Sequence, residues 1–140
     1  MTHKRLLGFE YLIRLERGEE FFAELEKFCR RQKIQAGWFW ALGAFERATL
    51  SYYNLRGKKY SDKKLNRLLE AVSLTGNIAT MSGKRIFHAH CVLSAKNLRA
   101  YGGHLKKGIV GGTLEVYLKV FGKKISRKHS RGSGLKLLDL

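Results

Sequence analysis

Alternating apolar and polar positions predict that the chain begins with a half-buried strand. The odd-numbered positions from Leu7 to Leu15 are all apolar, whereas Gly8, Glu10 and Arg14 fall on the opposite side. Successive side chains of a strand point to opposite faces of its sheet. We therefore expect a strand over residues 6–15, with one face packed in the core.

The next segment changes to the period of an amphipathic helix. Apolar residues recur at helical spacing between Phe21 and Cys29, with glutamates near the start and basic residues near the end. This order of charges matches the helix dipole, which favours acidic residues at the N-terminus and basic ones at the C-terminus. The pattern predicts a helix from about Glu19 to Gln32, after a turn at residues 17–19.

The rest of the chain favours short strands. Five apolar runs predict strands, over residues 38–45, 47–54, 77–81, 86–94 and 110–121. The strands 77–81 and 86–94 are expected to form a hairpin across Ser82-Gly83. Residues 65–74 fit either element, and we favour a short helical turn leading into a strand. The order of elements predicts an α+β domain. Its mostly antiparallel sheet would have seven or eight strands, with one main amphipathic helix packed on it.

The length and composition indicate one domain over residues 1–140. Apolar residues make up 44% of the chain, which is enough for a core, and no apolar run approaches a membrane span. Charged residues come too early for a signal peptide, so we expect a cytoplasmic protein without a membrane partner. Cys29 and Cys91 lie in apolar patterns and are expected to be buried thiols.

The charge is strongly unbalanced. The chain has 28 Lys and Arg against 11 Asp and Glu, a net charge of +17, and such a field attracts polyanions, nucleic acid first. The basic residues gather in three places: around the loop of residues 56–67, on both sides of His104 (residues 96–107), and in a basic C-terminal segment, residues 122–140. A solvated basic surface is the alternative interpretation. The candidate nucleic-acid-binding residues are Arg56, Lys58, Lys59, Lys63, Lys64, Lys123, Lys124, Arg127, Lys128 and Arg131.

Three histidines form the candidate chemical site. His88 and His90 lie on one face of the predicted strand 86–94, about 7 Å apart along it, and His104 follows Gly102-Gly103. Two such imidazoles can share a metal ion if a third ligand closes the site. Three neutral imidazoles suit zinc best and leave one coordination position open. We predict zinc ligation by these three residues, with ordinary strand histidines as the alternative.

Several short motifs follow one another along the chain. They are 12–19 (LIRLERGE), 41–45 (ALGAF), 69–78 (LEAVSLTGNI), 88–94 (HAHCVLS), 101–105 (YGGHL), 113–116 (TLEV) and 134–138 (GLKLL). Each motif is short, but the ordered set is specific and runs from about Leu12 to Leu138. Taken together, these motifs resemble the PPC domain, the domain conserved in plants and prokaryotes.

The resemblance implies a homotrimer built on a mostly antiparallel sheet. It also implies that H-x-H and G-G-H form a metal-binding trio, usually for zinc, and all three positions are filled here by His88, His90 and His104. Glu70 and Glu115 lie in matched segments. They would orient a metal-bound imidazole or water, or else pair with arginines such as Arg14 at a subunit boundary.

Plant relatives join this domain to an AT-hook, an R-G-R-P element that enters the DNA minor groove. This chain contains no proline and so resembles the prokaryotic type without an AT-hook. The nearest string, residues 56–59 (RGKK), is better interpreted as a solvated turn. DNA binding is therefore predicted from charge.

Two functional hypotheses follow. We expect a non-enzymatic, metal-containing homotrimer that binds DNA non-specifically through its basic surface. The alternative is a zinc-dependent enzyme that acts on a small anionic substrate at the three-histidine site, with Lys106 or Lys107 binding the substrate's charge. No nucleophile–base pair is visible in the sequence.

Overall fold

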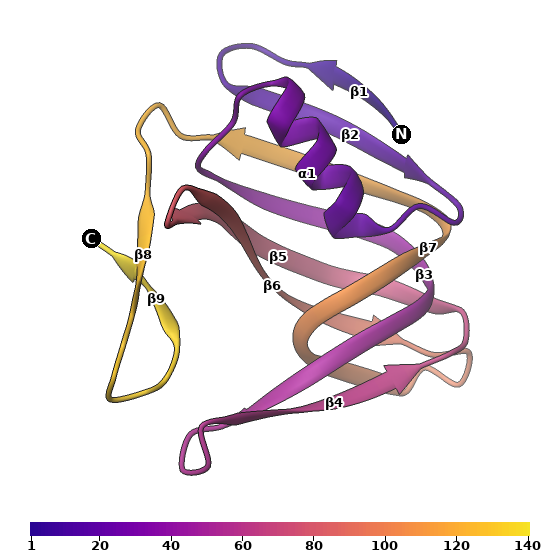
Figure 1. Cartoon of the computed structure of the whole chain (residues 1–140). Coiled ribbons are helices and arrows are strands. Elements are labelled where there is room, and N and C mark those ends of the chain that lie inside the picture. The colour runs from indigo at the N-terminus through magenta and orange to yellow at the C-terminus, as the bar shows by residue number, and fades with distance from the viewer.

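The computed structural model describes residues 1–140 and consists of one nine-stranded sheet and one helix (Figure 1). The elements in chain order are β1 (Thr2–Arg5), β2 (Glu10–Glu16), α1 (Phe21–Arg31), β3 (Gly37–Asn54), β4 (Lys59–Leu65), β5 (Leu69–Met81), β6 (Lys84–Ser94), β7 (Ala100–Val120), β8 (Ser126–His129) and β9 (Lys136–Asp139).

The sheet is largely antiparallel and partly closed on itself. Its strand order is β1-β2-β7-β3-β5-β8-β9, with β4 on β3 and β6 joined to both β5 and β7. Only the pairing of β5 with β8 is parallel. Because β7, β3, β5 and β6 each pair with the next and β6 returns to β7, these four strands form a ring in the lower part of Figure 1.

Helix α1 covers one face of the sheet, across β2, β7 and β3 (Figure 1). It begins after Glu20, whose carboxylate accepts a hydrogen bond from the Ala23 amide at 2.7 Å and caps the helix. Its buried face presents Phe21, Leu25 and Phe28 to the sheet, where aromatic side chains of β3 contact it edge to face. The predicted helix is confirmed. It is too short and too polar to span a membrane.

The two long strands bend where glycine allows it. β3 has 18 residues and β7 has 21, and the register between them shifts just after Gly43. The register between β3 and β5 shifts just before Gly43. Gly43 has a φ of 138°, and a Cβ at this position would collide with the Thr113 carbonyl. A side chain here would therefore force the two strands apart, which is why the bend requires glycine.

The face of the sheet opposite α1 carries exposed apolar side chains. Leu12 alternates with buried neighbours on β2, and Trp40 and Leu42 do the same on β3. The register aligns Leu12 with Tyr117 and Tyr117 with Trp40, so these side chains share one surface. We call this surface, made by Leu12, Trp40, Leu42, Val72 and Tyr117, the outer apolar face.

Several predicted elements need correction. The sheet has nine strands, not seven or eight, and the two strands predicted over 38–45 and 47–54 are one continuous β3. The helical turn predicted at the start of 65–74 is wrong, because β4 ends at Leu65 and a short non-helical link leads to β5; the strand predicted after it is confirmed as β5. The missed strands are polar. β4 has one buried residue, and backbone hydrogen bonds to β3 rather than an apolar face hold it in the sheet.

Both cysteines are buried and free, as predicted. Burial raises the pKa of the Cys29 thiol and of the Cys91 thiol to about 12. Cys91 faces the core, while His90 beside it is exposed on the opposite face of β6.

The packing of α1 gives a direct test of the core. Leu25→Ala should lower the free energy of unfolding by about 2–5 kcal/mol, because Leu25 is fully buried against the sheet. Leu55→Ala, in the exposed turn after β3, is the matched control and should change it by about 0.5 kcal/mol or less. Urea denaturation measures both, and equal losses would contradict this assignment of the core.

Candidate metal centre

The alternation of β6 brings two imidazoles to one face. Ala89 and Cys91 point into the core, so His88 and His90 point outward, away from α1. The third imidazole comes from the neighbouring strand, because the register between β6 and β7 sets His104 directly opposite His90. Sequence positions far apart thus meet on the outer surface of the strand ring.

The three side chains converge closely. Each offers one ring nitrogen, and these three atoms all lie within 4.8 Å of one another. The ring centroids are 5.1 Å apart for His88–His90 and for His88–His104, and 5.4 Å apart for His90–His104. His90 is exposed while His88 and His104 are half-buried, so the cluster has one side open to solvent.

The electrostatic environment favours the neutral form of two imidazoles of this cluster, those of His88 and His104. Burial, and after it the positive charge of Arg127, lower the pKa of His88 to about 4. Burial also lowers the pKa of His104, against a weaker opposing effect of Asp62. These two imidazoles are therefore neutral at pH 7, which is the form that binds a metal ion. Three nitrogen donors with an open side fit a metal ion that keeps one position free.

One carboxylate lies beside the cluster. Asp62 of β4 and His104 of β7 are both paired with Ser51 of β3, on either side of it. The Ser51 hydroxyl donates a hydrogen bond to the Asp62 carboxylate at 2.7 Å, and the Lys106 ammonium forms an ion pair with the same carboxylate. Sequence reasoning missed Asp62. Its only signal in the sequence was that it is the sole acid among the basic residues of segment 56–67.

Tyr60 forms an aromatic wall of the cluster. Its ring lies 5.4 Å from the His104 ring and 4.7 Å from the Tyr53 ring, between centroids. The Tyr53 hydroxyl in turn donates a hydrogen bond to the Ser133 carbonyl at 2.7 Å. The C-terminal segment is thus attached to the strand pair that carries Asp62 and Tyr60.

Arg127 reaches the cluster from β8. Its guanidinium donates a hydrogen bond to the Asn77 side-chain oxygen at 2.7 Å and another to the Lys136 carbonyl at 2.5 Å. Asn77 lies directly opposite His88 in the β5–β6 pairing. Arg127 was predicted to contact nucleic acid, but the structure turns its side chain inward.

The two predicted supporting carboxylates lie elsewhere. Glu70 is opposite Ser94, at the end of β6 away from His88. Glu115 is opposite Leu42 and lines a shallow pocket of the outer apolar face. Neither is among the charged groups that shift the pKa of His88 or His104, and Asp62 is the carboxylate that does so.

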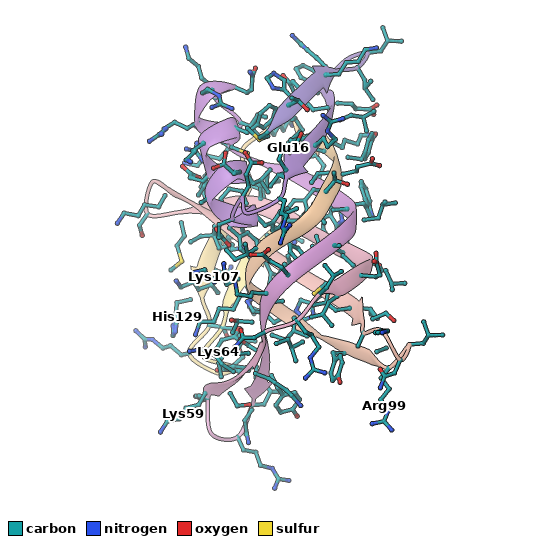
Figure 2. All side chains as sticks on the ribbon, turned by 90° about the vertical axis from the view of Figure 1, so that its right-hand side faces the viewer. Glu16, Lys59, Lys64, Arg99, Lys107 and His129 are labelled. Atoms are coloured by element: carbon teal, nitrogen blue, oxygen red, sulfur yellow. The ribbon has the colours of Figure 1, made fainter.

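The predicted nucleic-acid-binding residues divide by environment. Figure 2 labels Lys59 and Lys64, which project from β4. Lys64 and Lys107 flank Thr49 on β3, so two lysines from different strands lie near each other. In contrast, Lys58 donates a hydrogen bond to the Arg131 carbonyl at 2.9 Å. Arg56 and Lys63 are exposed, and Lys128 forms an ion pair with Asp139 at 2.6 Å.

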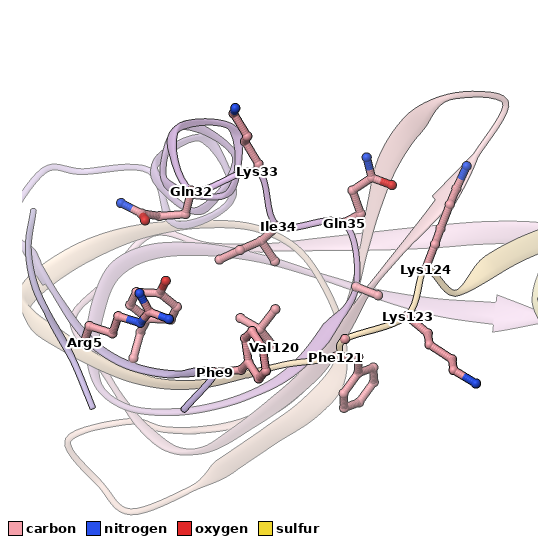
Figure 3. Close-up of a pocket in the computed structure, with 13 residues that line it drawn as sticks. Arg5, Phe9, Gln32, Lys33, Ile34, Gln35, Val120, Phe121, Lys123 and Lys124 are labelled. Carbon is pink, nitrogen blue, oxygen red and sulfur yellow. The ribbon is translucent and has the colours of Figure 1, made fainter. Parts of the chain in front are cut away.

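Lys123 and Lys124 line a separate hollow of about 470 Å³ (Figure 3). It lies between the end of α1 and the strands β1 and β7, and Arg5 and Lys33 also line it. The lysine side chains extend outward from its rim in Figure 3 rather than toward one another. None of the three clustered histidines lines this hollow.

Known proteins share this fold over almost its full length. A candidate DNA-binding protein from Bacteroides thetaiotaomicron superposes with a TM-score of 0.94 at 29% identity, covering 99% of this chain and 96% of the other. A metal-containing protein from Archaeoglobus fulgidus superposes with a TM-score of 0.86 at 30% identity, covering 98% and 97%.

A curated relative is much longer than this chain. The bifunctional protein GlmU of Synechococcus sp. (strain JA-3-3Ab) is 32% identical over 110 residues, which are 77% of this chain and 16% of that protein. The model of the Plants and Prokaryotes Conserved domain, abbreviated PCC or PPC, matches residues 5–122. The chain therefore belongs to the Plants and Prokaryotes Conserved domain family.

Proposed function

We propose that this chain is a metal-containing, oligomeric DNA-binding protein whose three-imidazole centre holds zinc. The convergence of His88, His90 and His104 on one open-sided cluster carries the proposal. Three neutral nitrogen donors are a ligand set that zinc favours. A related protein that contains metal, at 30% identity over nearly the whole chain, supports the same assignment.

The residues around the centre have distinct roles in this proposal. A bound zinc ion would supply Lewis acidity at its open position. Asp62 tempers the positive field at His104, and Ser51 fixes the direction of that carboxylate. Tyr60 shields the His104 ring on one side. The contact with Tyr60 restrains the His104 ring with or without an ion.

Removal of one ligand should empty the centre. Purified protein should contain about one zinc per chain by elemental analysis, and His88→Ala or His104→Ala should reduce this to near zero, because two imidazoles alone bind zinc weakly. His3→Ala and His129→Ala are matched controls, since these two histidines lie outside the cluster. Metal-free wild-type protein that takes up no added zinc would overturn the proposed centre.

The proposal of DNA binding rests on charge and on relatives. The net charge is +17, and most acids are already paired with cations of the chain, so a large excess of lysine and arginine faces solvent. Lys59, Lys63 and Lys64 are exposed along β4. Candidate DNA-binding proteins of the same fold, at 28–29% identity, support this role. Contacts to phosphates would give affinity without base preference.

Salt should control this affinity. Binding to duplex DNA should weaken with a log–log slope of several units, and Lys59→Gln with Lys64→Gln should lower the slope by about two. The control pair Lys4→Gln with Lys27→Gln removes the same charge from β1 and α1 and should leave the slope near the wild-type value. Fluorescence anisotropy at several salt concentrations measures the slope. A salt-independent affinity, or equal effects of both pairs, would contradict the proposed surface.

We also propose that the chain assembles as a homotrimer through the outer apolar face. The family resemblance suggested the trimer. The outer apolar face suits it, because Leu42 is 59% exposed and Trp40 is 47% exposed on a continuous surface. Burial of such a patch against other copies removes apolar area from water.

A charge in this face should break the assembly. Sedimentation equilibrium should give about three times the chain mass of 16.1 kDa for wild-type protein. Leu42→Glu should shift the mass toward the monomer, because a buried unpaired carboxylate is costly. Leu55→Glu introduces the same charge in an exposed turn and should leave the trimer intact. A wild-type monomer at micromolar concentration would exclude the trimer.

A zinc-dependent enzyme acting on a small anionic substrate is the second candidate function. One observation favours it: a guanidinium, that of Arg127, lies beside the open cluster. The sequence suggested that Lys106 or Lys107 binds the negative charge of the substrate. Lys106 instead forms an ion pair with Asp62, and in this candidate function Arg127 binds the substrate's charge. The first requirement of this function is anion binding at the centre.

A further inference from the structure

Arg127 is a half-buried cation without an acidic partner. Its guanidinium donates to the Asn77 side-chain oxygen and to the Lys136 carbonyl, both neutral groups. Its Nε atom is buried and has no hydrogen-bond partner. A guanidinium has five N–H donors. Two of those of Arg127 are used in these hydrogen bonds, and the other donors remain for a ligand. Buried polar groups are normally paired, and an unpaired one points to a missing ligand or water.

The nearby carboxylates cannot neutralise this charge. Arg127 belongs to the hairpin formed by β8 and β9, and the acid of this hairpin, Asp139, forms an ion pair with Lys128. Asp62 forms an ion pair with Lys106. None of the ion pairs of the chain includes Arg127. Three neutral imidazoles would also leave a divalent ion's charge uncompensated. The space beside Arg127 and the centre therefore has an excess of positive charge.

The β8–β9 hairpin holds this guanidinium in place. The Thr80 amide and hydroxyl both donate hydrogen bonds to the Ile125 carbonyl, at 2.9 and 3.2 Å. At the other end, Ser133 accepts from Tyr53. With Asn77 fixed opposite His88 by strand pairing, Arg127 is positioned before any ligand arrives. Such preorganisation lowers the entropy cost of binding.

We propose that Arg127 and the open side of the three-histidine centre together bind a small oxyanion, a carboxylate or a phosphate group. The inference rests on the proposed metal site and defines the ligand class of that site. The guanidinium offers charge-assisted N–H donors to one or two oxygens of the anion, and a metal ion held by the three histidines would supply an open coordination position for another. The inward, half-buried position of Arg127 favours a small molecule over the backbone of duplex DNA.

The test is anion titration of the cobalt-loaded full chain. Cobalt(II) reports changes at the metal by visible absorption, and calorimetry gives affinity, with inorganic phosphate and acetate as separate probes at constant ionic strength. Wild-type protein should bind at least one probe with a spectral change. Arg127→Gln should weaken that binding at least tenfold while cobalt affinity is retained, because a charged donor is lost. Lys124→Gln removes a charge from the exposed rim of the separate hollow between α1, β1 and β7, and it should change binding less than twofold.

The outcomes separate the two proposals. Failure of wild-type protein to bind cobalt would remove the metal site and this inference with it. Bound cobalt with no response to either anion, or equal affinities in wild-type and Arg127→Gln protein, would overturn the inference alone. Arg127→Lys retains charge but loses the planar donor set, so it should show an intermediate affinity and decides the case if the glutamine variant does not fold. The probe that binds identifies the carboxylate or the phosphate class.

Discussion

The register between β6 and β7 places His90 opposite His104, and the whole candidate centre depends on it. Side chains alternate along a strand, so a slip of one residue would turn an imidazole into the core and bring a buried side chain out. The register is well determined because Ala89, Cys91 and Leu93 of β6 pack in the core. Core packing on one face thus positions metal-binding groups on the other.

The ring of four strands adds the second constraint. Since β3 pairs with β4, β5 and β7, Ser51 aligns both with Asp62 and with His104. Asn77 aligns with His88 in the same way, and it receives Arg127 from the C-terminal hairpin. Two neighbouring rows of backbone pairings therefore bring together groups from five strands, β3 to β7, and Arg127 joins them from β8. Basic residues that seemed equivalent in the sequence divide into solvent-facing lysines and one inward arginine.

The polar segments explain most differences between prediction and structure. Residues 59–65 lack an apolar face, and residues 126–139 resemble a solvated tail, yet both form strands. Neighbouring strands supply their hydrogen bonds, and the hairpin is further held by Tyr53 and Thr80. The alternation of apolar and polar residues indicates which side chains are buried. It therefore cannot reveal strands that are held only by backbone hydrogen bonds to a neighbouring strand. Asp62 and Arg127 lie on two of these strands, so hydrophobic periodicity could not show that Asp62 lies beside the histidines or that the Arg127 side chain points inward.

The sequence by itself determined helix α1, the core face of β2, the β5–β6 hairpin and the shared face of His88 and His90, because each follows from local periodicity. The ordered motifs also indicated the domain family. Only the tertiary structure decided that His104 meets the other two imidazoles, that Asp62 and Arg127 join them, and that Glu70 and Glu115 do not. These relations depend on which residues lie opposite each other in strands that are distant along the chain. The spacing of apolar residues within one strand does not determine that register.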